Sequence, residues 1–309
     1  MRALHRFRPR RELGRTGFKA TVLGIGDLAD RRVPLDECVA TARRALDAGL
    51  NVIDTAPGYE AGYSEEIVGR ALQGRRDGIF VIDKIDHLAK PVGPQVAASL
   101  RRLGLERVDL FLFHGCSTMD AWQRLAAPGG GMEQLDAARR AGHCRFRGIS
   151  SHHPEALRAA IESGLCDVVM FAIGPYADPR YEAEALPLAR QRGVGTVCFK
   201  TFGTGKLLTD TEGYGRPLAN LPRGKVGSGG AAAREPILPH LSVEECVRYT
   251  LTADPDVALL GLSFPNEQDA ALAAAASFKP LSADAMADIR RRAAEAVQGK
   301  GPCWWNPDG

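Results

Sequence analysis

NVIDTAPGYEAGYSEEIVGRALQG, residues 51–74, is one strand-like run, one loop and one helix-like run in succession. Its first six residues are mostly apolar or β-branched, a composition that favours a buried strand. From residue 64 onward, apolar side chains recur three or four positions apart and the run ends at Gly74, which is typical of a helix followed by a glycine. The segment predicts a strand followed by a helix that packs back against it.

This pair of strand and helix is repeated along the chain. Eight apolar runs are candidate strands: ATVLGIG (20–26), NVIDTA (51–56), IFVIDK (79–84), VDLFLFH (108–114), RFRGIS (145–150), CDVVMF (166–171), GTVCFK (195–200) and VALLGLS (257–263). Helical spacing fills most of the intervals, at residues 35–49, 64–74, 95–104, 132–142, 154–164 and 182–193. The alternation predicts parallel strands joined by crossover helices.

Eight strands in such an alternation predict an α/β fold, a single (β/α)8 TIM barrel domain over residues 1–309. An open, doubly wound sheet has the same periodicity, so the polar residues must decide between the two. Barrel enzymes place their active sites at the C-terminal ends of the strands. Five candidate strands carry a polar or charged residue there: Asp54, Lys84, His114, Ser150 and Lys200. We assign the barrel core to residues 10–275 and a C-terminal helix and tail to residues 276–309.

Two long connections interrupt the alternation. Residues 115–131 follow the fourth strand, and residues 203–240, rich in glycine and proline, follow the seventh. Connections of this length in a compact domain are often functional. We expect both to wall a binding site, although plain surface insertions would have the same composition.

Composition limits the class of partner. The net charge of +3 is spread without a long basic run, so nucleic acid is not expected. The seven cysteines are scattered and form no CxxC pair, which argues against a disulfide framework and favours a reducing compartment. The arginine-rich start lacks the apolar core of a signal peptide, and no stretch is long enough to cross a membrane. We expect a soluble, cytoplasmic protein, and its oligomeric state stays open.

Asp54, Tyr59, Lys84 and His114 carry the strongest chemical hypothesis. Three of them end successive strands, so they should meet at one end of the barrel, and Tyr59 follows Asp54 on the adjoining loop. A phenol gives up its proton reluctantly near neutral pH, and a neighbouring ammonium stabilises the phenolate. We expect Lys84 to do this for Tyr59 and to be held by Asp54. His114 would hydrogen-bond a substrate oxygen.

These residues lie in a chain that resembles the aldo-keto reductase family from about residue 10 to about residue 275. LGRTGFKATVLGIG (13–26) looks like that family's N-terminal β-hairpin and first strand, and residues 51–72 are similar to its second strand and helix. The resemblance implies hydride transfer between a nicotinamide cofactor and a carbonyl or alcohol substrate. It also implies that Asp54, Tyr59, Lys84 and His114 are the catalytic tetrad, with Tyr59 as general acid in reduction and general base in oxidation. Tyr63 competes with Tyr59, but its spacing from Asp54 departs from the family pattern.

By the same resemblance, residues near the ends of later strands hold the cofactor. Ser150 and Ser151 stand where the family has Ser-Asn, and Met170 where it has glutamine, so polar contacts to the nicotinamide carboxamide are lost. Phe199 would stack on the nicotinamide, and residues 202–208 resemble the segment that covers the pyrophosphate. The implied cofactor residues, with no metal ligand among them, are Ser150, Ser151, Met170, Phe199, Lys200, Phe202, Gly203, Gly205, Lys206, Ser263, Asn266 and Gln268.

The resemblance favours NADP(H) as the cofactor and leaves NAD(H) possible. The family often has basic residues for the 2′-phosphate after its last strand, whereas residues 261–271 contain none. We expect Arg216, Arg223 or Lys225 to supply the missing charge. The identity of the substrate and the direction of the reaction stay open.

Three other interpretations remain. Residues 22–30, VLGIGDLAD, contain the GxGxxA of a Rossmann turn, but polar residues and a proline follow instead of a helix. A metal-dependent barrel hydrolase would use a set of imidazoles and one carboxylate near the barrel mouth: His87, His114, His152, His153 and Asp86. A binding or regulatory subunit would keep the fold without the activity, as the changes at Ser151 and Met170 suggest.

The tail GKGPCWWNPDG, residues 299–309, places Trp304 beside Trp305. Two adjacent indoles have too much apolar area to be left in water. We expect the tail to pack on the barrel, to close the substrate pocket, or to contact a partner subunit.

Overall fold

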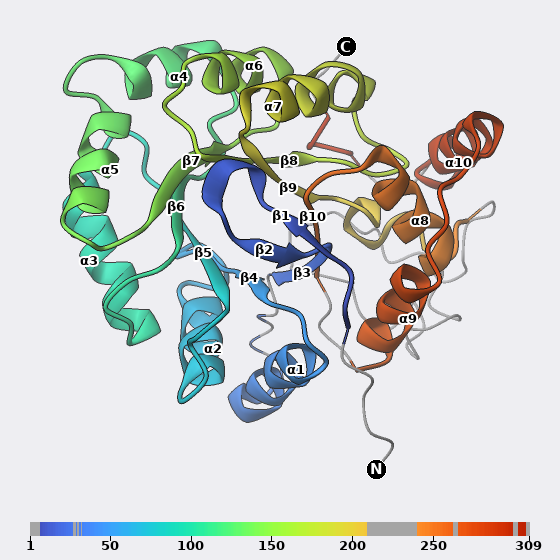
Figure 1. Ribbon diagram of the computed structural model, residues 1–309, viewed down its shortest axis with the longest axis horizontal. Coiled ribbons are helices and arrows are strands. Elements are labelled where there is room, and N and C mark those ends of the chain that lie inside the picture. Colours follow the sequence, from blue (N-terminus) through green and yellow to red (C-terminus); the bar gives the residue numbers. More distant parts are fainter. Residues whose placement is uncertain are drawn as a thin grey trace.

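Eight parallel strands close into a barrel in the order β10-β3-β4-β5-β6-β7-β8-β9, which confirms the predicted fold (Figure 1). The computed structural model describes residues 7–26, 29, 31, 33–208, 240–261, 265–298 and 302–306. The barrel strands are β3 (Leu23–Gly26), β4 (Val52–Asp54), β5 (Phe80–Ile85), β6 (Leu110–Phe113), β7 (Phe146–Ser150), β8 (Val168–Ala172), β9 (Gly195–Phe199) and β10 (Val257–Leu260). Because all neighbours pair in parallel, the C-terminal ends of the strands share one end of the barrel.

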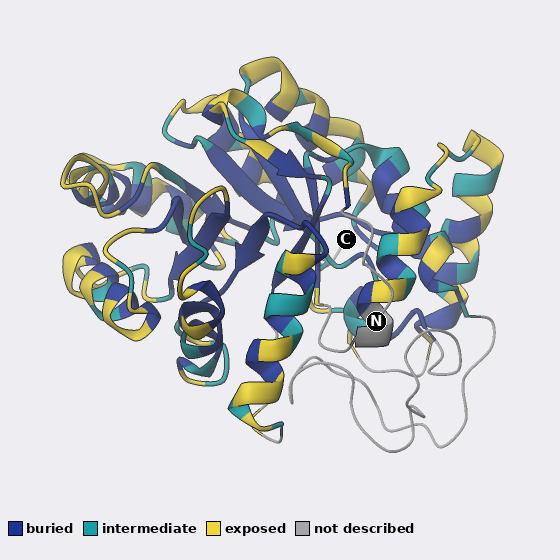
Figure 2. Ribbon diagram, turned by 60° about the horizontal axis from the view of Figure 1, so that its bottom comes forward, coloured by how far each residue is buried: buried dark blue, intermediate teal, exposed yellow. Residues whose placement is uncertain are grey.

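Helices surround the barrel, and those next to it turn their buried faces toward the strands (Figure 2). They are α1 (Leu35–Asp47), α2 (Tyr63–Leu72), α3 (Val92–Leu103), α4 (Met119–Ala126), α5 (Gly131–Arg140), α6 (Pro154–Glu162), α7 (Leu186–Arg192), α8 (Val243–Ala253), α9 (Pro265–Ala276) and α10 (Ala283–Ala296). Short helical turns occupy η1 (Gly14–Thr16), η2 (Tyr181–Ala185) and η3 (Gly203–Gly205). A capping box starts α8, because the side chains of Ser242 and Glu245 each accept a backbone hydrogen bond from the other residue.

Side chains alternate between the barrel interior and the layer under the helices. The interior cluster contains Val52, Phe80, Ile82, Leu110, Leu112, Val168, Met170, Val197, Val257 and Leu259. The antiparallel hairpin of β1 (Arg10–Glu12) and β2 (Lys19–Thr21), expected from the sequence, adds Leu13 and Ala20 to it. The ring centroids of Phe18 and Phe80 are 5.1 Å apart. The hairpin therefore closes the N-terminal end of the barrel, and the opposite end carries the polar strand-end residues.

The closed barrel rules out the open-sheet and Rossmann interpretations. Gly24 and Gly26 lie inside β3, and a Cβ at either would come within 3.1 Å of β4, at Val52 and Asp54 respectively. These glycines allow β3 to pack tightly between its neighbours. They do not form a phosphate-binding turn.

The connection at 115–131 contains α4, a helix that the sequence pattern did not reveal. The Thr118 hydroxyl caps it by accepting a hydrogen bond from the Ala121 N–H at 3.1 Å. Only Trp122 and Leu125 of its eight residues are buried, so its apolar pattern is too short to predict a helix. Of the second connection, only residues 203–208 and 240 are described, and its expected role as a wall lies mostly outside the described residues.

The seven cysteines all lie in the described residues and form no disulfide. Six of them are buried and the seventh, Cys303, is half-buried in the tail. Within the described ranges, no helix combines the length and apolar character that a membrane span requires.

We predict that Gly69→Ala lowers the free energy of unfolding by about 1–3 kcal/mol. A Cβ at Gly69 in α2 would lie 2.2 Å from the Leu103 carbonyl oxygen of α3, so the two helices would have to separate. The matched control is Gly93→Ala in α3, where no heavy atom lies within 4 Å of the added Cβ. Urea unfolding of both variants measures the difference, and equal stability would mean that the helices are not in close contact.

Candidate active site

The four residues proposed as a tetrad meet at the C-terminal end of the barrel. Asp54, Lys84 and His114 follow Val52, Ile82 and Leu112 at a spacing of two, so strand alternation turns them toward the interior axis. Tyr59 joins them from the loop between β4 and α2.

Lys84 and Asp54 form a buried ion pair. The Lys84 ammonium donates to both Asp54 carboxylate oxygens at 2.6 Å and to the Thr55 carbonyl oxygen at 2.7 Å. Each side chain is only 2% exposed. A buried charge of this kind persists only when it is paired and hydrogen-bonded, so the three acceptors hold the ammonium in one place.

Tyr59 lies against both Lys84 and His114. The Lys84 nitrogen is 4.5 Å from the centroid of the Tyr59 ring, and the ring meets the His114 imidazole edge-on at 5.5 Å. The two residues after Tyr59, Glu60 and Ala61, have φ of 50° and 52°, a conformation that L-residues seldom adopt. Arg31 braces this turn by donating to the Glu60 carbonyl oxygen at 2.6 and 3.0 Å.

Tyr63, the competing tyrosine, has its hydroxyl engaged elsewhere. It is the first residue of α2 and donates to the Val33 carbonyl oxygen at 3.0 Å. Loss of hydration, with Cys38 and Glu66 nearby, raises the pKa of Tyr63. Of the two tyrosines, the geometry favours Tyr59 as the one next to Lys84 and His114.

His114 has a carboxylate partner that the sequence analysis considered only as a metal ligand. Its Nδ1 lies 2.6 Å from Oδ1 of Asp86, which follows β5. Burial alone would raise the pKa of Asp86, but the hydrogen bond and charge of His114, with the Gly58 N–H and Lys84, lower it overall. The only sign of this contact in the sequence is that an acidic residue, Asp86, stands two positions after Lys84. No group of three or more potential metal ligands occurs among the residues that the structure describes.

A second carboxyl group lies behind Lys84, on the outer face of β5. Asp83 is fully buried and accepts from the Lys84 N–H at 2.8 Å, whereas its Oδ2 has no hydrogen-bond partner in the described part of the chain. Burial and the neighbouring Glu65 carboxylate raise the pKa of Asp83 well above its usual value. Glu65 is itself buried and paired with Arg102. Asp83 is therefore favoured in its neutral form.

The residues expected near the nicotinamide carboxamide offer few polar atoms. The Ser150 hydroxyl accepts from the Gly115 N–H at 2.9 Å. The Ser151 hydroxyl donates to the His153 carbonyl oxygen and accepts from its N–H, at 3.2 and 3.1 Å. Met170 is buried in the apolar interior. Both hydroxyls are thus engaged in local structure.

The end of β9 has the features of an anion site. Lys200 has φ of 75°, and its ammonium lies 5.6 Å from the centroid of the Phe199 ring. Phe202 leads into the tight turn at Gly203 and Gly205, followed by the buried Lys206. Thr201 is buried, and its hydroxyl has no partner among the described residues. Two cations and an unsatisfied hydroxyl therefore lie within seven residues.

The remaining cofactor residues lie apart or outside the described set. The Gln268 amide donates to the Thr41 carbonyl oxygen at 2.8 Å and accepts from Arg44 at 3.1 Å, which ties α9 to α1. Ser263 lies outside the described residues, and only the backbone of Asn266 is described. Three cations proposed for the 2′-phosphate also fall outside the described residues: Arg216, Arg223 and Lys225.

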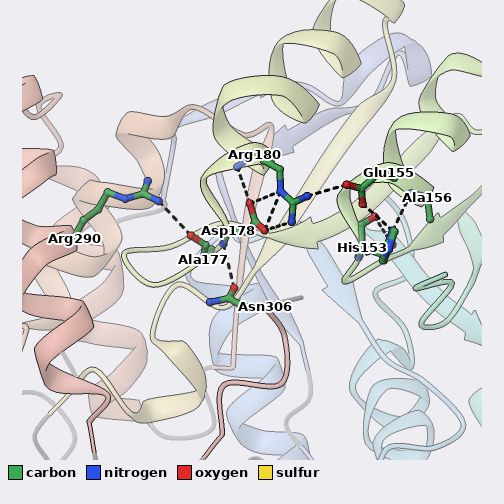
Figure 3. Close-up of polar contacts among 9 residues, drawn as sticks. His153, Glu155, Ala156, Ala177, Asp178, Arg180, Arg290 and Asn306 are labelled. Carbon is green, nitrogen blue, oxygen red and sulfur yellow. Dashed lines mark hydrogen bonds and ion pairs between the residues drawn. The ribbon is translucent and has the colours of Figure 1, made fainter. Parts of the chain in front are cut away.

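The tail packs on the barrel, which is one of the three arrangements expected from the sequence. Trp305 is fully buried, and its indole N–H donates to the Tyr176 carbonyl oxygen at 2.9 Å. Asn306 accepts from the Asp178 N–H at 3.1 Å, and Arg180 joins Asp178 to Glu155 of α6 (Figure 3). These contacts fix the tail to the segment after β8.

Trp304 is the exposed member of the pair and lies near the site. It is 48% exposed, with the Lys200 ammonium 4.4 Å from its ring centroid and the His152 ring 5.0 Å away. Loss of hydration, with the charges of Lys200 and His114, lowers the pKa of His152 to about 3. The tail also accepts a hydrogen bond from Lys206, at the Pro302 carbonyl oxygen, 2.6 Å away. Tail and site are therefore in direct contact.

Comparison with known proteins points to one family. Residues 21–229 match the sequence model of the Aldo/keto reductase family. An Escherichia coli protein named NADH-specific methylglyoxal reductase is 28% identical over 221 residues, which are 64% of this chain and 66% of that reductase.

Two solved structures share the fold. The holo form of aldo-keto reductase AKR11C1 from Bacillus halodurans is 26% identical, with a TM-score of 0.69, and the match covers 94% of this chain and 98% of that one. An aldo-keto reductase from Klebsiella pneumoniae in complex with NADPH is 21% identical, with a TM-score of 0.65, and the match covers 88% and 91%.

We predict that Asp83→Asn raises the melting temperature at neutral pH, and that the size of this gain depends on pH. A raised pKa in the folded state means that stability is lost as pH rises from the unfolded value of about 4. An amide keeps the acceptor for the Lys84 N–H but cannot ionise. The gain in melting temperature over the native protein should grow from pH 4 to pH 8, and a gain that is constant with pH would show that Asp83 ionises normally.

We predict that Trp305→Ala lowers the free energy of unfolding by about 3–5 kcal/mol, since it removes a fully buried indole. Trp304→Ala is the matched control and should cost under about 1 kcal/mol, as expected for a largely exposed residue. Chemical denaturation compares the two. Equal losses would mean that the tail detaches before the barrel unfolds.

Proposed function

The chain belongs to the aldo/keto reductase family, and we propose that it is an NAD(P)-dependent oxidoreductase acting on a small carbonyl or alcohol. The observation that carries the proposal is the position of Lys84. Its ammonium is buried between the Asp54 carboxylate and the Tyr59 ring, with His114 at the edge of that ring. A tyrosine beside a fixed cation, at the open end of a barrel, is suited to proton transfer.

Each residue has a separate task. Tyr59 donates a proton to the carbonyl oxygen in reduction and accepts one from the alcohol in oxidation. Lys84 stabilises the phenolate that remains after Tyr59 has donated, and Asp54 keeps the ammonium charged and in place. His114 orients the substrate oxygen by a hydrogen bond. A bound nicotinamide cofactor supplies or accepts the hydride.

The residues after β9 fit the anionic part of such a cofactor. Lys200 and Lys206 supply positive charge, and the buried Thr201 hydroxyl offers a hydrogen bond that no described residue satisfies. Phe199 would lie against the nicotinamide. We take NADP(H) as the first cofactor to test and NAD(H) as the second, because the E. coli relative is named NADH-specific.

A binding or regulatory subunit is the second candidate. Ser151 is engaged in local hydrogen bonds and Met170 is apolar, so neither provides the polar contacts that the family makes to the carboxamide. A folded protein that binds neither NADPH nor NADH would favour this function.

We predict that Tyr59→Phe lowers kcat for carbonyl reduction by about 10²–10⁴, as expected for loss of a general acid. Methylglyoxal, named in the E. coli relative, is the first substrate to test. Cofactor affinity, followed by quenching of tryptophan fluorescence, should be unchanged because the ring is retained.

Tyr63→Phe is the matched control, and its kcat should stay near that of the native protein. It loses one hydrogen bond to Val33, which costs about 1 kcal/mol of stability at most sites. If Tyr63→Phe lost activity and Tyr59→Phe kept it, the assignment of the acid would be reversed.

A further inference from the structure

The Asp86 carboxylate connects the two groups that would face the substrate oxygen. It lies 2.6 Å from Nδ1 of His114 and accepts a hydrogen bond from the backbone N–H of Gly58, the residue before Tyr59. The Asp86 side chain is 20% exposed and that of His114 is 30% exposed. One carboxylate therefore braces both the Tyr59 loop and the His114 ring.

The charge of Asp86 determines which nitrogen of His114 carries a proton. The surroundings lower the pKa of Asp86, so it is a carboxylate at neutral pH. A carboxylate only accepts hydrogen bonds, so Nδ1 must be protonated to make this contact. A neutral His114 then has a lone pair on Nε2 and can only accept there, whereas an imidazolium donates from both nitrogens.

We propose that Asp86 is a positioning residue that locks Nδ1 of His114 in its protonated form, so that the direction of the Nε2 hydrogen bond to the substrate depends on the charge of the ring. This inference rests on the proposed oxidoreductase function. In reduction, the imidazolium donates from Nε2 to the carbonyl oxygen while Tyr59 transfers the proton and the cofactor the hydride. Oxidation runs through the same arrangement in reverse, so the imidazolium donates from Nε2 to the alcohol oxygen while the hydroxyl proton passes to Tyr59.

The charged neighbours are consistent with this assignment. The Lys84 ammonium is already paired with Asp54. The positive charges of Lys84 and Arg102 interact with the Asp86 carboxylate at longer range. His152, with a pKa of about 3, is neutral, and the Tyr59 ring meets His114 by its edge. Asp86 is thus the one carboxylate in contact with the His114 ring among the described residues.

A side chain at position 58 would disturb the same contact. A Cβ there would lie 2.6 Å from Oδ2 of Asp86, so the carboxylate would have to move. Gly58→Ala therefore displaces the carboxylate without changing its charge. This variant disturbs the contact of Asp86 with His114 independently of Asp86→Asn.

The first experiment observes the imidazole directly and needs no turnover. In protein labelled with [15N]histidine, the His114 signals are assigned by their loss in His114→Gln, and both ring nitrogens are followed from pH 5 to pH 9. In the native protein we expect the neutral ring to carry its proton on Nδ1, next to the Asp86 carboxylate. In Asp86→Asn we expect the neutral ring to become a mixture of tautomers. A native ring that is neutral with its proton on Nε2 would overturn the proposal.

The second experiment measures kcat for reduction and for oxidation over the same pH range. Because both directions use the same protonated ring, we expect kcat for reduction and kcat for oxidation to respond alike to loss of the Asp86 carboxylate. In Asp86→Asn, and in Gly58→Ala, reduction should fall by at least about tenfold, with a smaller change in KM. Asp77→Asn, at an exposed carboxylate near the opposite end of β5, is the matched control.

The NMR and kinetic experiments test the role of Asp86 and the oxidoreductase function separately. If no carbonyl is turned over with either cofactor but the NMR result is as expected, the oxidoreductase function fails and the Asp86–His114 pair stands. If turnover is found but Asp86→Asn keeps the native pH profile and the native tautomer, the role of Asp86 is refuted and the oxidoreductase function stands.

Discussion

The buried ion pair of Lys84 and Asp54 is the constraint on which the active end of the barrel depends. Between this pair and the hairpin the interior cluster is apolar, and an unpaired ammonium beside it would carry a large desolvation cost. The pair forms only because β4 and β5 are neighbours and both side chains point inward. The ammonium in turn lies against the Tyr59 ring, so the position of the proposed acid follows from the order of the strands.

Around this pair, one short segment holds two carboxyl groups whose pKa values are shifted in opposite directions. Asp83 points under the helices, where burial and Glu65 favour its neutral form. Asp86, three residues later, lies beside His114 and Lys84, which favour the carboxylate. The difference arises from strand alternation and from the end of β5, since the residue type is the same. Titratable groups whose environments separate their pKa values are typical of acid–base sites.

The sequence was sufficient for the barrel and for the meeting of Asp54, Lys84 and His114, because strand alternation and strand ends are local patterns. The N-terminal hairpin was expected only from the resemblance to the family. The sequence was insufficient for α4, whose buried face has only two residues. It could not reveal the bond between Asp86 and His114, since the partners are 28 positions apart and each lies just beyond the end of its strand. Gln268 shows the same limit: it was expected to contact the cofactor, and nothing in the local sequence indicates that its amide faces α1.

Strand alternation also restricts how such a chain can change over evolutionary time. Losing or gaining one residue within β4, β5 or β6 would reverse which face of the strand each later side chain occupies, and would turn Asp54, Lys84 or His114 from the interior toward the helices. Loops beyond the strand ends are free of that parity, so their lengths can change without turning these side chains. Insertions and deletions can therefore accumulate in the loops beyond the strand ends, whereas within the barrel strands they would displace the inward-facing side chains.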